Sequence, residues 1–215
     1  MKRVIAVLLL ISVVFSISAC GLGDAGKTVK VQENGVYVDY TICYDDNDTY
    51  TLIRNMVITL PQPMSEDKAQ FIGSSVETYL EKTLKSALPN TLEPMLCNVA
   101  GIDSKGEVTQ KQKEYYITIP SATEMGFTDD SILEDGTAFQ YFTTDTRIAY
   151  NEKGQACVYL TRSLNKDKTT EMICVSNRGG MMSVKATQQI SFRPIIKVKK
   201  ENIQDKQGKL YYDKF

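Results

Sequence analysis

Residues 74–88 read SSVETYLEKTLKSAL and form the clearest helix pattern in the chain. Ser74, followed three residues later by Glu77, has the spacing of a capping box, in which each side chain satisfies a free backbone N–H group at the start of a helix. Pro89 and Asn90 then end the pattern. Apolar residues recur every three or four positions, which predicts a helix with one face packed on the core. These residues are Val76, Tyr79, Leu80, Leu84 and Leu88.

Short runs of alternating apolar and polar residues surround this helix and are typical of β-strands. Residues 35–44 and 49–60 precede it, and further runs follow it, separated by turns rich in Gly, Asn and Asp. We therefore expect an α+β fold in a single domain, with one main early helix followed by a mainly antiparallel β meander. The later runs are residues 115–119, 141–144, 157–161, 172–176, 181–185 and 192–198.

The first twenty residues have the parts of a secretory signal. Lys2 and Arg3 precede an apolar run of about 14 residues, which is shorter than the roughly 20 needed to span a bilayer. Residues 17–20 read ISAC, and small residues before a cysteine resemble the lipobox of bacterial lipoproteins. The resemblance implies cleavage before Cys20, diacylation of its thiol, and an extracytoplasmic protein anchored to a bacterial cell membrane or outer membrane.

These features divide the chain into four parts. We expect a signal peptide at residues 1–19, the lipidated cysteine and a flexible tether at 20–34, the folded domain at 35–199, and a polar tail at 200–215. Residues 21–28, GLGDAGKT, match the pattern of a phosphate-binding loop, but such a loop needs a buried strand before it and a helix after it. Because a signal peptide precedes the match, we expect a tether and no bound nucleotide.

The composition excludes several classes of function. The chain has no histidine, so Ser-His-Asp and Cys-His catalysis and histidine-containing zinc sites are excluded. A formal net charge of −1 provides no basic field for nucleic acid. We therefore expect no catalytic residue, no metal site, no nucleic-acid partner, and no cofactor besides the covalent lipid on Cys20.

The remaining cysteines leave two interpretations open. An exported protein can form disulfides, and Cys157 and Cys174 lie in strand-like runs that could pair as a hairpin, which makes them a candidate disulfide. Alternatively, Cys43, Cys97 and these two residues are buried thiols that pack as small apolar groups. No pair has the C-x-x-C spacing of a zinc or redox motif.

Four motifs occur in order along the chain: SVETYLE at residues 75–81, IPSATEMG at 119–126, YLTRS at 159–163 and SFRPII at 191–196. Together they resemble an uncharacterised bacterial surface domain whose fold is akin to C-type lectins and formylglycine-generating enzymes. The resemblance implies a C-type-lectin-like fold in which the motif residues are mostly structural.

The resemblance also implies roles for two arginines. Arg193 would lie on a central strand, where its guanidinium holds backbone carbonyls or a carboxylate such as Glu124. Arg162 is the other candidate for a buried ion pair. A surface position is the alternative for each arginine.

The anchor and this resemblance together favour a non-catalytic binding domain for an envelope or extracellular protein or glycan. One alternative is an accessory structural envelope protein without a small ligand. Another is a copper-dependent thiol oxidase, which would need convergent thiolates from Cys157 and Cys174. A concave patch lined by tyrosines would favour the binding domain. The candidate tyrosines are Tyr115, Tyr141, Tyr150, Tyr211 and Tyr212.

Overall fold

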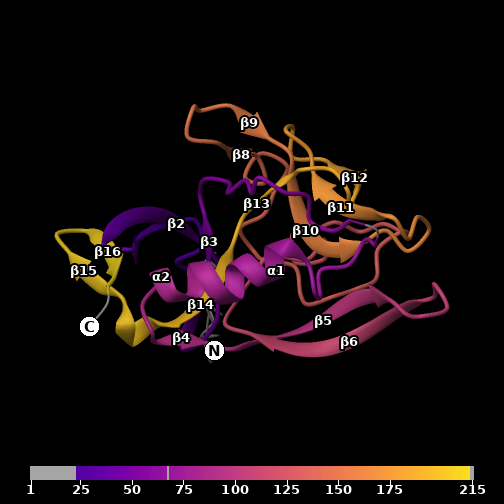
Figure 1. The fold of residues 1–215 in the computed structure, drawn as a ribbon. Helices are drawn as coiled ribbons and strands as arrows, with labels where there is room; N and C mark the ends of the chain where they lie inside the picture. The colour runs from indigo at the N-terminus through magenta and orange to yellow at the C-terminus, as the bar shows by residue number, and fades with distance from the viewer. Residues whose placement is uncertain (1–22, 67, 214–215) are drawn as a thin grey trace, which may run out of the picture.

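The computed structural model describes residues 23–66 and 68–213, which form two curled sheets, two separate hairpins and one main helical segment (Figure 1). In the larger sheet, the first and last strands of the described chain lie side by side. β1 pairs with β16 in parallel, with Val29 opposite Leu210, whereas the other pairs in this sheet are antiparallel. Its strand order is β15 (Gln204–Lys206), β16 (Lys209–Tyr212), β1 (Thr28–Glu33), β2 (Val36–Asp45), β3 (Thr49–Arg54), β14 (Ile195–Lys199) and β4 (Leu92–Glu93), and β7 (Ile117–Thr118) also pairs with β14.

The smaller sheet is mixed as well, because β10 runs antiparallel to β11 and parallel to β13. Its strand order is β12 (Met181–Lys185), β11 (Glu171–Val175), β10 (Tyr159–Leu164) and β13 (Ser191–Phe192). The hairpins outside the sheets are β5 (Met95–Ile102) with β6 (Val108–Tyr115) and β8 (Ala149–Tyr150) with β9 (Ala156–Cys157), and a 3₁₀ turn, η2 (Lys200–Asn202), follows β14.

The helix predicted from the apolar repeat is confirmed at residues 75–87. Ser74 Oγ accepts the Glu77 N–H at 3.0 Å, as a capping box requires, but the Glu77 carboxylate accepts the N–H of Gly73, at 2.6 Å, instead of that of Ser74. The apolar face of the helix belongs to the main hydrophobic core, which it shares with strands of both sheets. The helix consists of α1 (Ser75–Tyr79), a π-helical turn η1 (Leu80–Leu84) and α2 (Lys85–Ala87).

The expected α+β fold, an early helix followed by an antiparallel meander, is wrong. Three strands, β1 to β3, precede the helix, and the chain after it builds parts of two mixed sheets. The physical reason is that β1 to β3 leave two open sheet edges, and unpaired edges expose backbone N–H and C=O groups. The late strands β14 and β16 return to pair with these edges. The fold is therefore mostly β, and the C-type-lectin-like arrangement is not found.

The ends of the folded part also differ from expectation. Residues 28–33, expected in the flexible tether, form β1, and residues 204–206 and 209–212, expected in the polar tail, form β15 and β16. Val29, Val31 and Tyr212 are completely buried. A few apolar residues in a polar stretch give a weak strand pattern, and here the pairing between distant segments supplies the burial.

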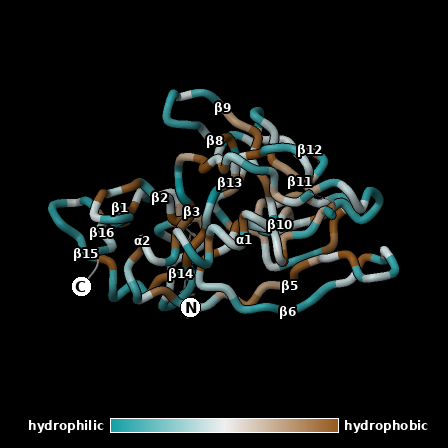
Figure 2. The backbone as a smooth tube through the Cα atoms, viewed as in Figure 1, coloured by the Kyte–Doolittle hydropathy of each residue, from teal (hydrophilic) through white to brown (hydrophobic). Residues whose placement is uncertain are grey.

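Hydropathy explains why the β5–β6 hairpin is absent from the predicted strands. Figure 2 shows hydrophobic residues where the sheets and helix meet, whereas β6 is largely hydrophilic. Residues 110–114 of β6 are exposed, although the strand pairs with β5 along its whole length. A strand exposed on both faces has no apolar alternation by which a sequence could identify it.

Gly179 in the β11–β12 turn offers a test of this packing. Its φ is +77°, and an added Cβ would lie 1.8 Å from the carbonyl oxygen of Thr144, a backbone atom. Gly35 has a similar φ of +84°, but nothing lies within 4 Å of its Cβ position. We expect Gly179→Ala to lower the free energy of unfolding by about 1–3 kcal/mol more than Gly35→Ala, because only the first adds a clash to the backbone strain. Urea unfolding of both variants measures this difference, and equal losses would contradict the contact.

Glu77 makes stability depend on pH. Burial disfavours its charge, but hydrogen bonds from Lys113, the Gly73 N–H and Tyr115 outweigh burial and lower the pKa of Glu77. A carboxylate whose pKa is lower in the folded state stabilises the fold above its unfolded pKa of about 4.3, and the contribution is lost as the pH falls through the folded value.

Glu77→Gln should therefore cost about 1–3 kcal/mol at neutral pH. This difference from the wild type should shrink as the pH falls below about 4. Glu81→Gln is the matched control, because Glu81 lies on the same helix and its ion pair with Lys85 is long, at 3.9 Å. Urea unfolding at several pH values measures both, and a Glu77→Gln deficit that does not change with pH would contradict the assignment.

Candidate functional site

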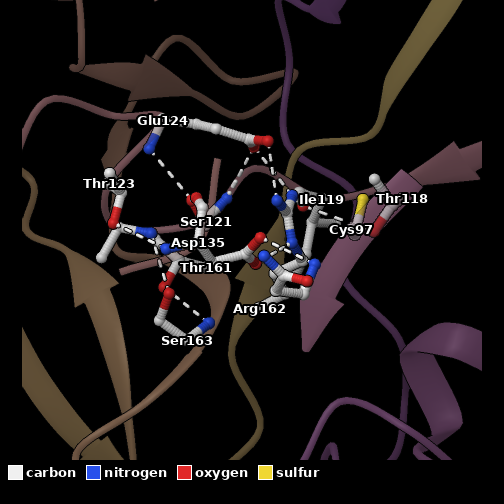
Figure 3. Close-up of polar contacts among 12 residues, drawn as sticks. Cys97, Thr118, Ile119, Ser121, Thr123, Glu124, Asp135, Thr161, Arg162 and Ser163 are labelled. Carbon is white, nitrogen blue, oxygen red and sulfur yellow. Dashed lines mark hydrogen bonds and ion pairs between the residues drawn. The ribbon is translucent and has the colours of Figure 1, made fainter. Parts of the chain in front are cut away.

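Arg162 lies at the centre of a buried polar cluster (Figure 3). It is 1% exposed, and its two terminal nitrogens donate to the two carboxylate oxygens of Glu124, both at 2.7 Å. Its Nε donates to Asp135 Oδ2 at 2.5 Å, and Nη1 also donates to the Ile119 carbonyl at 2.8 Å. The planar guanidinium therefore joins two carboxylates in a way that a lysine could not.

The loop between β7 and β8 supplies both carboxylates, and Ser121 fixes its shape. Ser121 Oγ accepts the Glu124 N–H at 2.9 Å and donates to the Asp135 carbonyl, while the Ser121 N–H donates to Glu124 Oε2 at 2.9 Å. Asp135 Oδ1 accepts the N–H of Asn98, on β5, at 3.0 Å. The cluster therefore ties β10, β5 and the loop together.

The Arg162 cluster is a structural centre. Burial alone would lower the pKa of Arg162, but the neighbouring Glu124 charge outweighs it and raises that pKa, so the guanidinium stays charged. Each of the four carboxylate oxygens of Glu124 and Asp135 accepts a hydrogen bond from the protein. The cluster's charged groups are thus engaged with one another, which favours a structural role.

For Arg193, the predicted contact with a backbone carbonyl is confirmed, whereas the alternative pairing with Glu124 is not found and the predicted position on a central strand is wrong. Arg193 lies in the link between β13 and β14 and is 3% exposed. Its Nε donates to the carbonyl of Arg54 at 2.8 Å, and its guanidinium lies 5.4 Å from the ring centre of Tyr159. Arg193 thus holds a backbone carbonyl, while Glu124 belongs to Arg162.

A groove of about 490 Å³ lies between the end of β3 and the β8–β9 turn. An ion pair lines it: Arg54 Nε donates to Glu33 Oε1 at 3.1 Å, and the two side chains are 12% and 13% exposed. The hydroxyl of Tyr40 donates to the same oxygen at 2.7 Å. Burial, together with the Glu33 charge, raises the pKa of Tyr40, so this hydroxyl keeps its proton.

Part of this ion pair remains open to the groove. Arg54 Nη1 donates to the Met56 carbonyl at 2.8 Å. Within residues 23–66 and 68–213, no hydrogen bond engages Glu33 Oε2 or Arg54 Nη2. The groove therefore presents one hydrogen-bond acceptor and one two-proton donor from a single ion pair.

Tyr79 is the tyrosine that lines the groove, whereas Tyr150 directly precedes the lining residue Asn151 and is exposed. Tyr150 is 48% exposed and Met56 is 36% exposed, and the Val57 N–H donates to the Tyr150 carbonyl at 3.1 Å. Of the other candidate tyrosines, Tyr115 and Tyr212 are buried, and Tyr141 and Tyr211 are partly buried. Two acidic and two basic side chains line the groove, so their formal charges cancel.

A larger hollow, of about 690 Å³, lies over the loop at residues 127–134. Its charged lining consists of Asp129, Asp130, Glu134 and Lys166. Asp129 is already engaged by the N–H and hydroxyl of Ser131, at 2.8 and 2.6 Å. The hollow has an excess of exposed acidic groups but no buried polar group directed into it, so the groove at Glu33 and Arg54 is the better candidate site.

Comparison with known proteins places the chain in a family. A family model described as "Domain of unknown function (DUF6273)" matches residues 47–200, which is more than half of the chain. The chain belongs to this family. The DUF6273 match includes the Arg162 cluster, Arg54 and Tyr150, whereas Glu33 lies before it. No curated protein and no solved structure matches the chain.

The four cysteines in the described part of the chain do not form the candidate disulfide. Cys43, Cys97, Cys157 and Cys174 are all free thiols. Cys174 on β11 lies opposite Leu160, whereas Cys157 on β9 lies opposite Ala149, so the two never face each other across one hairpin. Burial raises the pKa of Cys97 to about 12 and raises those of Cys43 and Cys174 as well. These buried thiols stay protonated, which disfavours thiolate chemistry.

Two further predictions concern membranes and metals. Cys20, the predicted lipidation site, lies outside the described residues, and so does the apolar run that precedes it. No helix in the described part of the chain is long and apolar enough to cross a membrane. Within that same part, no group of three or more Cys, Asp or Glu side chains is arranged to hold a metal ion.

Sequence reasoning missed three residues of these sites. Glu33 was assigned to the tether, and Arg54 ends a strand without any distinguishing pattern. Asp135 is one of several acidic residues in its loop, next to Glu134 and close to Asp129. Only the folded arrangement distinguishes Asp135 from these neighbours.

Proposed function

We propose that this protein is a lipid-anchored, extracytoplasmic binding domain that takes a neutral saccharide in the groove lined by Glu33 and Arg54, next to Tyr150. The anchor is the diacylated Cys20, and support for it comes from the sequence: a basic start, a short apolar run and ISAC at residues 17–20. Two acyl chains give a stable attachment where one gives only a marginal one.

The observation that carries the binding proposal is the half-open ion pair of Glu33 and Arg54. A sugar hydroxyl can donate to Glu33 Oε2 while its neighbour accepts from Arg54 Nη2, because a hydroxyl is both donor and acceptor. Hydrogen bonds to charged groups are the stronger kind. The cancelling charges of the groove disfavour a strongly charged ligand, since either sign would meet like charge.

Tyr150 supplies the apolar part of this recognition. The exposed ring of Tyr150, in the residue next to the lining residue Asn151, offers a flat amphipathic surface for the C–H face of a sugar. An accessory protein without a ligand does not need such an arrangement. The groove, with Tyr79 in its lining and the exposed Tyr150 next to Asn151, therefore favours binding over a purely structural role.

An array screen tests the proposal. Detergent-purified full-length protein is applied to printed glycans and printed envelope proteins, and so are two variants, Tyr150→Ala and Tyr116→Ala. Tyr116 is also exposed, but its ring lies under the Lys85 ammonium and does not line the groove. We expect a neutral glycan to be bound by the wild type and Tyr116→Ala and to be lost from Tyr150→Ala. Binding only to proteins, or to no printed molecule, would contradict the saccharide proposal.

Glu33→Gln should weaken binding of that glycan roughly tenfold to hundredfold, because it removes a charged acceptor while keeping the shape of the side chain. Glu152→Gln, an exposed carboxylate at the same groove, is the matched control and should leave affinity nearly unchanged. Titration calorimetry measures both dissociation constants. Equal losses in the two variants would show that the effect is one of general charge and not of the ion pair.

A further inference from the structure

The described chain begins with a turn that is fastened to the body of the domain. The Asp24 N–H donates to Asp45 Oδ2 at 2.8 Å, and the Asp24 carboxylate accepts hydrogen bonds from Tyr50 and Lys27. The Gly26 N–H donates to the Ile42 carbonyl at 2.8 Å. We call the contacts of Asp24 with Asp45, Tyr50 and Lys27 the Asp24 clamp.

Close packing and charge reinforce the clamp. Gly23 has a φ of +55°, and an added Cβ would lie 2.2 Å from Asp45 Oδ2, so the chain passes directly over that side chain. Lys200 forms an ion pair with the other carboxylate oxygen of Asp45, Oδ1, at 2.5 Å. The hydrogen bonds from Lys27 and Tyr50 lower the pKa of Asp24, so the clamp is fully charged at neutral pH. Residues 23–26, expected to be part of a flexible tether, are therefore part of the folded body.

We propose that the Asp24 clamp holds the folded body directly against the membrane, with the anchor face (Asp24, Asp45, Asn47 and Lys200) toward the bilayer and the groove away from it. This rests on the proposed lipidation of Cys20. Cys20 and Gly23 are three residues apart, which a fully extended chain spans in about 10 Å. We call residues 20–23 the leash, and its length limits the distance between the folded body and the membrane surface to about 10 Å.

The geometry of β3 places the groove away from the leash. Tyr50 lies near the start of β3 and holds Asp24, whereas Arg54 ends the same strand and lines the groove. Four residues of a strand extend about 13 Å. The groove therefore opens at the end of β3 that is farther from the anchor.

Charge does not set this orientation. The hollow on the anchor face is lined by two lysines, Lys199 and Lys200, and by two acidic residues, Asp48 and Glu201. Anionic lipids attract basic clusters and not balanced ones. The covalent leash and the clamp are therefore the orienting elements, and the orientation should not depend on the fraction of anionic lipid.

Energy transfer to the membrane tests this orientation. The full-length protein in a Cys157→Ser background is labelled with a donor dye at Asn47→Cys on the anchor face or at Lys153→Cys beside the groove. It is then reconstituted into vesicles of phosphatidylethanolamine and phosphatidylglycerol that contain an acceptor lipid. We expect higher transfer from position 47 than from position 153. Inserting about ten Gly and Ser residues after Gly21, which lengthens the leash and leaves the clamp intact, should abolish the difference.

The outcomes separate the two proposals. Mass spectrometry of the N-terminal peptide first shows whether Cys20 is diacylated, and an unacylated peptide would overturn the proposed anchor and this inference together. Equal transfer from the two positions of an acylated protein would overturn the orientation alone. A difference that survives the insertion would also contradict it, because the leash would then not be the cause.

Discussion

Arg162→Met is expected to lower the free energy of unfolding by about 3–5 kcal/mol, the range seen when one partner of a buried ion pair is removed. The variant keeps most of the side-chain volume but leaves the carboxylates of Glu124 and Asp135 buried without a cation. Since the free energy of unfolding of a typical domain is only about 5–15 kcal/mol, this loss would be a large part of the total stability. Urea unfolding followed by far-UV circular dichroism measures it.

Two companion variants make the prediction specific. Arg178→Met removes an arginine that is exposed in the β11–β12 turn and should change stability little. Arg162→Lys keeps the charge but cannot donate to both carboxylates in the same fork, so it should recover only part of the loss. If Arg162→Met is as stable as Arg178→Met, the cluster does not hold β10, β5 and the loop together.

Cys20→Ala is expected to abolish acylation of the protein completely. The thiol is the only group at that position that can carry a thioether-linked lipid, and each buried CH₂ of an acyl chain contributes about 0.8 kcal/mol to membrane attachment. Cys157→Ala, which removes another cysteine that is not fully buried, is the control and should keep the label. Metabolic labelling with an alkyne fatty acid in a bacterial host measures both.

Acylation that persists in Cys20→Ala would contradict the anchor. So would an N-terminal peptide of the wild-type protein that still contains residues 1–19. In that case the apolar run would have to hold the protein in the membrane, although it is shorter than the roughly 20 residues needed for a span.

The strongest local pattern predicted its local structure well, whereas the strand predicted at residues 141–144 is wrong, because this segment belongs to the loop between β7 and β8. The helix at residues 75–87 follows from its apolar repeat, and its start follows from Ser74 and Glu77. Both features depend on residues within four positions of one another, which a sequence displays directly. The same information is insufficient for the sheets, because β1 pairs with β16 and β3 with β14 across nearly the whole chain.

The sites were harder to predict than the helix. The motifs predict a buried ion pair for Arg162 and either a backbone carbonyl or Glu124 for Arg193, because motifs do not specify which distant groups meet; the structure gives Glu124 to Arg162 and a carbonyl to Arg193. The groove depends on Glu33, which lies in a strand that looked like tether, and on Arg54, which lies two strands away in the sheet. Ion pairs between distant strands have no periodic pattern, so only the folded chain reveals them.

The most direct test of the central claim is to map where the saccharide binds. Backbone amide chemical shifts of the full-length protein in detergent micelles are followed during titration with the neutral glycan that binds most strongly in the array screen. The account predicts that the largest changes occur at Val57, Ile58 and Tyr150, which lie in or beside the groove. Largest changes on the anchor face, near Asp24 and Lys200, would contradict it.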